Sequence, residues 1–290
     1  MSDFIKLHQK HFNFRQFVVN AFKEDVGDGD HTALSIIPKD HKGWLQLLIK
    51  EEGIIAGIEA AELIFKLVDK KIKFKRLVKD GDKVKKGQVA FIVFGNTQKL
   101  ITSERLILNI MQRMSGIATK TAQLQALCKG TKAKVIDTRK TTPGFRFFEK
   151  WAVVIGGGSN HRYGLFDMIL IKDNHIDFAG GITDAIDDAN SYLKKKKKKL
   201  SVEVETRSID DVKKVLAHGG VKRIMLDNFS PAETLQAVKI ISGKFEIESS
   251  GGITEKNIAE YAKCGVDFIS VGALTHHVKS LDLSLKALKR

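Results

Sequence analysis

The sequence is poor in cysteine and proline. Its 290 residues include two cysteines and three prolines. Cys128 and Cys264 lie far apart and match no metal-ligand spacing, so a disulfide framework and a cysteine-based metal site are excluded, and two buried thiols in a reducing compartment are expected. Few prolines together with 43% hydrophobic and 29% charged residues exclude a disordered, low-complexity chain and indicate a globular protein.

Targeting and membrane signals are also missing. Residues 1–14 are polar and contain no apolar core of a secretory signal. No stretch reaches the roughly 18 apolar residues that a membrane-spanning helix requires. These absences predict a soluble, cytoplasmic protein with no membrane partner.

Acidic residues are fewer than basic ones, which leaves a net charge of +15. Such an excess favours either a nucleic-acid partner or small anionic ligands. Six of the positive charges form one run, Lys194–Lys199, which is typical of a solvated helix end. Because no nucleic-acid-binding motif accompanies the run, we expect no nucleic-acid partner, and the remaining excess is available for small, highly charged anions.

The first part of the chain mixes helical and strand patterns. Helices are predicted over 13–24 and 57–68, a strand over 44–50, and a hairpin-rich β segment with Asp-Gly and Lys-Gly turns over 75–95. A long helical pattern then covers 102–128, and Gly116 is expected to break it.

The second half repeats with a period of 22 residues. Apolar, strand-like segments begin at residues 201, 223, 245 and 267, and amphipathic helical patterns fill the gaps over 208–217, 231–241 and 254–263. Two earlier segments, AKVID at 133–137 and DMILIK at 167–172, raise the number of predicted strands to six. Strands and helices alternating at one period predict parallel strands. Because no glycine-rich dinucleotide fingerprint follows the first strand, an incomplete β/α barrel is favoured over an open sheet.

The same period aligns polar residues at the strand ends. It places Glu205, Asp227, Ser249 and Val271 in one register, and Thr206, Asn228, Ser250 and Gly272 in the next. Chemistry in such barrels takes place at the carboxyl ends of the strands. Arg139 and Lys140 follow AKVID, and Lys172 follows DMILI. Three cations and two carboxylates are therefore predicted to meet at one mouth.

The last two predicted strands end in the glycine-rich turns ESSGGIT and SVGALTHH. Gly251, Gly252 and Gly272 either make tight turns only, or leave backbone N–H groups open to a phosphate, the usual ligand of the final loops in this architecture. Glu205 and Asp227 suit either a general acid–base pair or Mg²⁺, bound directly or through its waters. Glu203 faces the same way but deeper, so spacing leaves open which glutamate meets the ligand.

Four basic groups exceed what one phosphate needs: Arg139, His161, Arg162 and Lys172. Arginine binds carboxylates bidentately, and the segment IGGGSNHRYG brings His161 and Arg162 in on a glycine-rich loop where the backbone can approach a ligand. The residues thus predict a barrel mouth that holds a phosphorylated, Mg²⁺-bound substrate together with a small polycarboxylate.

Seven ordered segments carry a resemblance to a known family. They are EDVGDGDHT, TSERLILNIMQRMSGIAT, DTRKTTPGFRFFEKWAV, GGGSNHRYGLFDMILIKDNHI, EVE with LDNF, ESSGGI and SVGALTHH, and they cover essentially the whole chain. The sequence resembles the quinolinate phosphoribosyltransferases, also called carboxylating nicotinate-nucleotide pyrophosphorylases. The resemblance implies a Mg²⁺-dependent condensation of quinolinate with phosphoribosyl pyrophosphate that yields nicotinate mononucleotide, pyrophosphate and CO₂ for NAD biosynthesis.

The resemblance also implies a role for each matching site residue. The quinolinate carboxylates would be bound by Arg105, Arg139, His161, Arg162 and Lys172. Phosphoribosyl pyrophosphate would be bound by Lys140, Glu205, Asp227, Ser250, Gly251, Gly272 and His276, with Glu205 and Asp227 also holding Mg²⁺, directly or through water.

The fold that the resemblance implies is an N-terminal α/β sandwich domain, here residues 1–115, followed by an incomplete barrel, here 116–276. The family's barrel is usually described as seven-stranded, and six strands are found here. A C-terminal helix over 277–290 is expected to pack back on the first domain. The resemblance further implies a homodimer, or a higher oligomer, whose sites are completed by the partner's N-terminal domain.

Two features depart from the family pattern, the lysine run and one extra residue between Glu205 and Asp227, and both lie outside the motifs. A molybdenum-associated homologue of the same fold is the nearest alternative enzyme. We would not expect it to retain NHR and KDNH together.

Overall fold

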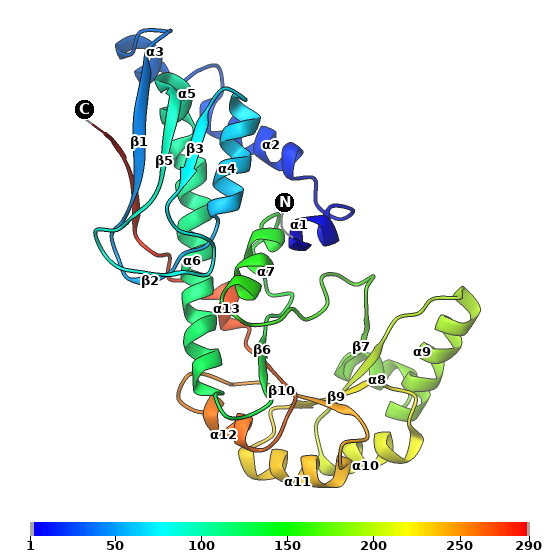
Figure 1. The fold of residues 1–290 in the computed structure, drawn as a ribbon. Coiled ribbons are helices and arrows are strands. Elements are labelled where there is room, and N and C mark those ends of the chain that lie inside the picture. Colours follow the sequence, from blue (N-terminus) through cyan, green and yellow to red (C-terminus); the bar gives the residue numbers. More distant parts are fainter. Residues whose placement is uncertain (1–2, 289–290) are drawn as a thin grey trace. The chain divides into compact units, whose positions relative to one another are not determined.

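The structure is a computed structural model that describes residues 3–288 (Figure 1). The chain forms two compact units that interleave along the sequence. The first contains the residues up to Lys120, the segment Thr142–Gly157 and the residues from His277 onward, and the second contains Thr121–Thr141 and Gly158–His276. The first unit therefore includes Thr142–Gly157, which was expected in the barrel domain over 116–276, and it also includes the residues from His277 onward, which were expected to pack on the domain over 1–115.

The first unit is built on an antiparallel sheet in the order β12-β1-β5-β3. Its strands are β1 (Lys42–Ile49), β3 (Lys73–Arg76), β5 (Val89–Asn96) and β12 (Leu283–Ala287), and a two-stranded ribbon joins β2 (Gly53–Ile54) to β4 (Lys83–Val84). Helices are α1 (Asp3–His8), α2 (Phe14–Val26), α3 (His31–Ile36), α4 (Ile58–Val68), α5 (Thr97–Thr102), α6 (Glu104–Leu127, which continues into the second unit) and α7 (Arg146–Ile155). Alternate residues of β1, among them Leu45, Leu47 and Ile49, are buried, as the period of a half-buried strand requires.

Aromatic packing explains why α7 belongs to the first unit. The rings of Phe147 and Phe12 stack with centroids 4.2 Å apart, and the rings of Phe148 and Phe17 lie 4.9 Å apart. Both α7 phenylalanines are fully buried or nearly so. These offset and tilted contacts join the segment 142–157 to the N-terminal helices.

The C-terminal segment is a strand, so the helix expected over 277–290 is wrong for the described residues. β12 pairs antiparallel with β1, with Leu285 opposite Leu47, and the two strands run side by side in Figure 1. Leu281, Leu283 and Leu285 are buried with a period of two. A short pattern of this kind suits a strand once an open sheet edge is available, and that edge lies more than 200 residues away in the sequence.

Gly116 does not break α6, contrary to expectation. The helix is continuous, and a Cβ atom at Gly116 would overlap the carbonyl oxygen of Lys279 and lie 3.1 Å from Cα of Ser280. Gln112 fixes the same segment, since its carbonyl accepts from Leu281 N at 3.0 Å and its side-chain amide donates to Leu283 O at 3.0 Å. Glycine is present here because the C-terminal segment passes directly against the helix.

The second unit is a six-stranded parallel sheet in the order β6-β11-β10-β9-β8-β7, with helices between the strands. The strands are β6 (Lys134–Ile136), β7 (Ile169–Ile171), β8 (Val202–Thr206), β9 (Arg223–Asp227), β10 (Glu246–Ser250) and β11 (Phe268–Ser270). The helices are α8 (Asp173–Ala179), α9 (Ile182–Lys196), α10 (Ile209–His218), α11 (Pro231–Ile241), α12 (Ile258–Lys263) and α13 (Ala273–His276). The six predicted strands and the fold class, an N-terminal α/β domain followed by a partial β/α barrel, are confirmed.

A trace of a seventh strand lies beside β6. Ser159 forms an isolated parallel bridge to Ile136, and its N–H donates to Val135 O at 2.9 Å. A single bridged residue in a glycine-rich loop has no apolar run of its own, which is why a strand pattern could not be found there.

The register inferred from the 22-residue period is wrong. Glu205 pairs with Met225, and Asp227 pairs with Ser250. Ser249 does not line the mouth, because Glu248 and Ser250 on either side of it face inward. Strands of a barrel are staggered by their tilt, so a constant spacing in the sequence does not align residues in space.

Both cysteines are free and buried, as expected. Among the described residues, no helix combines the length and the apolar character that a bilayer crossing demands.

The lysine run forms the end of α9 and the loop after it, and Lys194–Lys199 are exposed. Positive side chains at a helix C-terminus complement the helix dipole, and exposed charges in salt contribute little else. We therefore expect that replacing all six lysines by Ser or Gln leaves turnover within about twofold. Steady-state kinetics at two salt concentrations measure this, and a large, salt-independent loss would show that the run takes part in function.

Candidate active site

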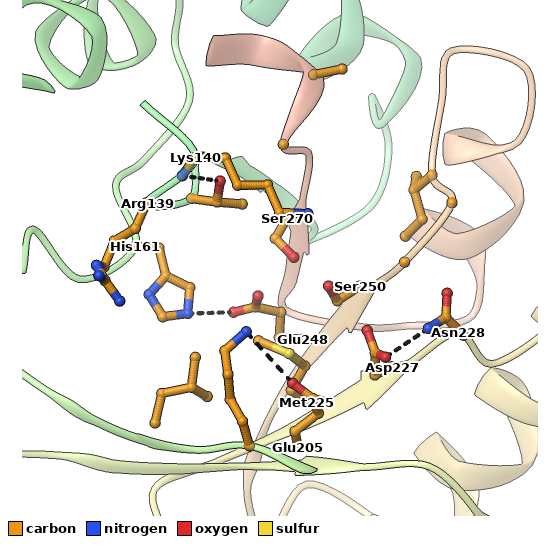
Figure 2. A pocket seen from close by; sticks show the side chains of 18 of the residues that line it. Arg139, Lys140, His161, Glu205, Met225, Asp227, Asn228, Glu248, Ser250 and Ser270 are labelled. Atoms are coloured by element: carbon orange, nitrogen blue, oxygen red, sulfur yellow. Dashed lines mark hydrogen bonds and ion pairs between the residues drawn. The ribbon is translucent and has the colours of Figure 1, made fainter. Parts of the chain in front are cut away.

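A cavity of about 810 Å³ lies in the second unit, at the carboxyl ends of its strands (Figure 2). The predicted site residues that line it are Arg139, Lys140, His161, Arg162, Lys172, Glu205, Asp227, Ser250, Gly251, Gly272 and His276. Further lining residues that sequence reasoning did not assign include Thr138, Leu170, Asp173, Met225, Asn228, Glu248, Thr254 and Ser270. All of them belong to the second unit.

Arg105 is the one predicted site residue that does not line this cavity. It lies in the first turn of α6, within the first unit, and its side chain is exposed. The cavity of the second unit is therefore formed without it.

Two guanidinium groups form a basic side of the cavity. Arg162 is held by a hydrogen bond from Nη1 to Met168 O at 3.2 Å. Burial lowers the pKa of Arg162, and the positive charge of Arg139 lowers it further. Like charges that converge in one cavity repel each other until an anion lies between them, so this side suits an anionic ligand.

Lys140 is fixed through its backbone. Its N–H donates to Thr138 Oγ1 at 3.0 Å, and its carbonyl accepts from Thr275 Oγ1 at 2.7 Å. A Cβ atom at Gly272 would lie 3.1 Å from Lys140 Cδ and 3.1 Å from His276 Nε2. Gly272 thus lets the lysine and the histidine approach the same turn, where a phosphate group would find both side chains.

Two carboxylates form an acidic side. Burial raises the pKa of Glu205, and the negative charge of Asp227 raises it further. Lys172 Nζ is 3.9 Å from Glu205 Oε2. Asn228 Nδ2 donates to Asp227 Oδ2 at 2.7 Å, a contact drawn in Figure 2. A carboxylate whose charge is destabilised by a neighbouring carboxylate, in a cavity that admits water, fits a hard divalent cation such as Mg²⁺.

The sequence left open whether Glu203 or Glu205 faces the ligand, and the two residues differ in their position relative to the cavity. Glu205 lines the cavity, whereas Glu203 is fully buried and does not. Of these two glutamates, Glu205 is therefore the one placed to contact a ligand in the cavity.

The turn after β10 requires glycine. Gly251 and Gly252 have φ of +91° and +61°, and a Cβ atom at Gly251 would overlap the side-chain amide of Asn228. Asn228 is itself left-handed, with φ +57°, and its N–H donates to Ser250 O at 2.9 Å. The turn and the end of β9 are thus packed backbone to backbone at the rim.

The loop that carries His161 and Arg162 is anchored by Asp137, directly after β6. Asp137 accepts hydrogen bonds from His161 N at 3.0 Å and from Asn160 Nδ2 at 2.5 Å. Arg162 N–H donates to His161 Nδ1 at 2.6 Å. A fully buried aspartate therefore fixes where both side chains enter the cavity.

Glu248 is the most unusual residue that sequence reasoning missed. It lines the cavity, yet its exposed fraction is 0%. Its place in the strand could have been found from the period of two, because Glu248 faces the same way as Ser250. The raised pKa of Glu248 could not have been found from the sequence, because it depends on burial and on the neighbouring charge of Glu203. These two effects raise the pKa of Glu248 to about 8.

This raised pKa predicts a pH-dependent stability. The folded protein holds a proton on Glu248 that the unfolded chain, at a pKa of 4.5, has lost, so the free energy of unfolding falls as the pH rises from about 4.5 to about 8. Glu248→Gln removes this titration. We expect its stability relative to the wild type to increase between pH 5 and pH 9 by roughly 3–4 kcal/mol, at about 1.4 kcal/mol per unit. Urea unfolding at both pH values measures the difference, and parallel pH profiles would contradict the prediction.

The architecture of the second unit and the charges of its cavity indicate an enzyme. A partial β/α barrel carries, at the carboxyl ends of its strands, a cavity with one basic and one acidic side, and such an arrangement suits a small-molecule enzyme that handles anions and a divalent cation.

Comparisons with known proteins then give the family. The family model for the N-terminal domain of quinolinate phosphoribosyl transferase matches residues 30–115, and the model for its C-terminal domain matches residues 117–286. The chain belongs to the quinolinate phosphoribosyltransferase family.

Named relatives agree along nearly the whole chain. It is 46% identical to the chloroplastic carboxylating nicotinate-nucleotide pyrophosphorylase of Arabidopsis thaliana, over 95% of this chain and 83% of that protein. It is 44% identical to the mitochondrial decarboxylating quinolinate phosphoribosyltransferase 2b of Nicotiana tabacum, over 95% and 82%. The solved structure of nicotinate-nucleotide pyrophosphorylase from Francisella tularensis matches with a TM-score of 0.88 and 41% identity, over 95% of this chain and 96% of that chain.

Proposed function

We propose that this protein transfers the phosphoribosyl group of phosphoribosyl pyrophosphate to quinolinate and releases pyrophosphate and CO₂, with nicotinate mononucleotide as the product for NAD biosynthesis. The observation that carries the proposal is the cavity with opposed charges. Its basic side suits the two carboxylates of quinolinate, and its acidic side suits the ribose hydroxyls and cation of the second substrate. Membership of the family supports the same reaction.

Roles for the lining residues follow from this division. Arg139, Arg162 and Lys172 bind the quinolinate carboxylates. Lys140 and His276, which meet at Gly272, bind phosphate groups together with the turn at Ser250 and Gly251. Support for these roles comes from position and charge.

Mg²⁺ is the proposed cofactor, and Glu205 and Asp227 would hold it, directly or through water. Their proximity raises the pKa of Glu205 beyond the effect of burial, which is the situation that a bound cation relieves. When bound, Mg²⁺ would neutralise charge on the pyrophosphate.

The chemistry then depends on how the chain orients the two substrates. Arginine forks that clamp both carboxylates would align the quinolinate nitrogen with C1 of the ribose. Lys140 would stabilise the negative charge that builds up on the departing pyrophosphate, and Glu205 and Asp227 would offset the positive charge at C1. When the adjacent carboxylate leaves as CO₂, the electron pair of the broken bond stays on the ring carbon, where the neighbouring positive nitrogen stabilises it. A proton from water then replaces the lost group, so no nucleophile from the protein is needed.

We also propose a homodimer in which the partner's Arg105 completes the cavity. Arg105 is exposed and does not line the cavity of the second unit, which agrees with such a role. A cytoplasmic location stays a prediction, since plant relatives are named as chloroplastic and mitochondrial.

The direct test is release of labelled CO₂ from carboxyl-labelled quinolinate, in the presence of phosphoribosyl pyrophosphate and Mg²⁺. We expect release only when all three are present, with stoichiometric nicotinate mononucleotide. Nicotinate in place of quinolinate serves as the control substrate. Product formed equally well from nicotinate, or no product from quinolinate, would contradict the proposed reaction.

The basic side gives a sharper prediction. Arg139→Lys keeps the charge but loses the planar fork, so quinolinate binding should weaken by roughly 1–3 kcal/mol. Binding of phosphoribosyl pyrophosphate should change much less. Isothermal calorimetry with each ligand measures both, and equal weakening would assign Arg139 to the phosphate side.

A further inference from the structure

A cluster of ionisable residues adjoins the cavity, and all of them except its arginine are buried. Its members are His161, Glu203 on β8, Arg223 on β9 and Glu248 on β10. Arg223 Nη1 is 3.0 Å from Glu248 Oε2 and 3.8 Å from Glu203 Oε2. Burying ionisable groups costs free energy of desolvation, even where the groups are paired. A cluster that is kept at this cost next to a cavity points to a role in that cavity.

The cluster faces one edge of the His161 ring. Nε2 is 3.2 Å from Glu203 Oε2 and 3.6 Å from Glu248 Oε2 (Figure 2 shows the second pair). Both glutamates are fully buried, and only 8% of His161 is exposed. Nε2 therefore faces two carboxyl groups, of which Glu203 is the nearer.

The other edge of the ring accepts a hydrogen bond. Arg162 N–H donates to Nδ1 at 2.6 Å. A ring nitrogen that accepts a hydrogen bond does so through its lone pair and carries no proton, whereas both nitrogens of an imidazolium ion are donors. A ring without a proton on Nδ1 is neutral and carries its proton on Nε2. The contacts of the two nitrogens therefore define the neutral tautomer protonated at Nε2.

The same ligand atoms could in principle hold a metal, because His161, Glu203 and Glu248 offer atoms within 4.8 Å of one another. The guanidinium of Arg223 argues against it. It already supplies the positive charge at 3.0 Å from Glu248, and it is fixed there by a stack over the ring of Phe268 at 3.9 Å and by Glu246 Oε2 at 3.1 Å. A second cation would be repelled at this position.

We propose that His161 is a positioning residue: its ring is the neutral tautomer protonated at Nε2, with that nitrogen facing Glu203 and Glu248, and its Nδ1 accepts from the backbone N–H of Arg162, so that Arg162 reaches the substrate carboxylate. This differs from the role as a cationic ligand that the family resemblance implies for His161. Asp137 adds to the arrangement, since it binds the backbone N–H of His161 at 3.0 Å. The identity of the substrate, but not the tautomer, rests on the proposed function.

Three variants separate positioning from charge. His161→Asn retains an acceptor near the position of Nδ1, His161→Lys supplies a positive charge without an acceptor, and His161→Ala supplies neither. We expect kcat/KM for quinolinate to stay within about tenfold of the wild type in His161→Asn, and to fall about 100-fold in the other two, as for a misplaced substrate ligand. KM for phosphoribosyl pyrophosphate should change little in all three. Activity of His161→Lys above that of His161→Asn would overturn the proposal.

Nitrogen NMR on the wild-type protein with ¹⁵N-labelled histidine reads the tautomer directly. The signal of His161 is assigned by its loss in His161→Ala or, should that variant not fold, in His161→Asn. We expect a protonated Nε2 and an unprotonated Nδ1 at pH 7, and a proton on Nδ1, in either the other neutral tautomer or the imidazolium ion, would overturn the proposal. This result is independent of turnover. A wild-type protein that releases no CO₂ from quinolinate would remove the proposed function and leave the tautomer assignment standing.

Discussion

Mixing two inactive variants, Arg105→Ala and Lys172→Ala, is expected to restore activity. Each variant alone leaves a substrate carboxylate without a charged partner, which should lower turnover by about 100-fold or more. In a homodimer with shared sites, a mixed dimer has one site with both defects and one with neither. Random pairing makes about half of the dimers mixed, so activity should recover to about one quarter of the wild type. Native mass spectrometry monitors the subunit exchange, and steady-state assays of the exchanged mixture measure the recovered activity.

A reverse mixture provides the matched control. The double variant Arg105→Ala/Lys172→Ala is exchanged with the wild type in equal amounts. If the site is shared, both sites of a mixed dimer carry a defect, and about one quarter of the activity should remain. If each chain supplies its own Arg105, about one half should remain. One half in this mixture, with no recovery in the first, would show that Arg105 serves its own chain.

Gly116→Ala should lower the stability of the protein strongly. The new methyl group would overlap the backbone of Lys279, so either α6 or the C-terminal segment must move. The helix gains about 1 kcal/mol from alanine. We expect overpacking against a backbone to outweigh it and to lower the free energy of unfolding by roughly 3 kcal/mol.

Chemical denaturation measures the change, and limited proteolysis tests its cause. β12 should be cleaved faster in Gly116→Ala, because the segment that leads to it is displaced. Asn109→Ala, an exposed position on the same helix, is the matched control and should stay within about 0.5 kcal/mol. A more stable Gly116→Ala protein would mean that the close approach of the C-terminal segment is absent.

The barrel was predictable because its signals are local. Each strand in the second half is an apolar run followed by an amphipathic helix, so the strands beginning near 201, 223, 245 and 267 were recognisable one by one. Their register was not, because the stagger of the strands is a property of the closed sheet. The period placed Ser249 at the mouth, where the structure has Glu248 and Ser250.

The same distinction holds for the site. Residues at or just past the end of a strand, such as Arg139, Lys172 and Asp227, were found because parallel strands bring their ends together. Glu203 and Arg223 were not assigned a function, because their contacts depend on which strands become neighbours and on how deeply each side chain is buried. Gly116 was misread for a related reason: the segment that requires a glycine comes more than 160 residues later in the sequence.

The pairing of β12 with β1 has a consequence for synthesis on the ribosome. The emerging chain presents β1 early, but the strand that covers its edge is made more than 200 residues later. Until then the apolar edge of the first sheet is available for pairing with other nascent chains. A stop codon that removes only the residues after Leu281 should therefore give a protein that aggregates co-translationally, although every residue lining the cavity of the second unit has been made.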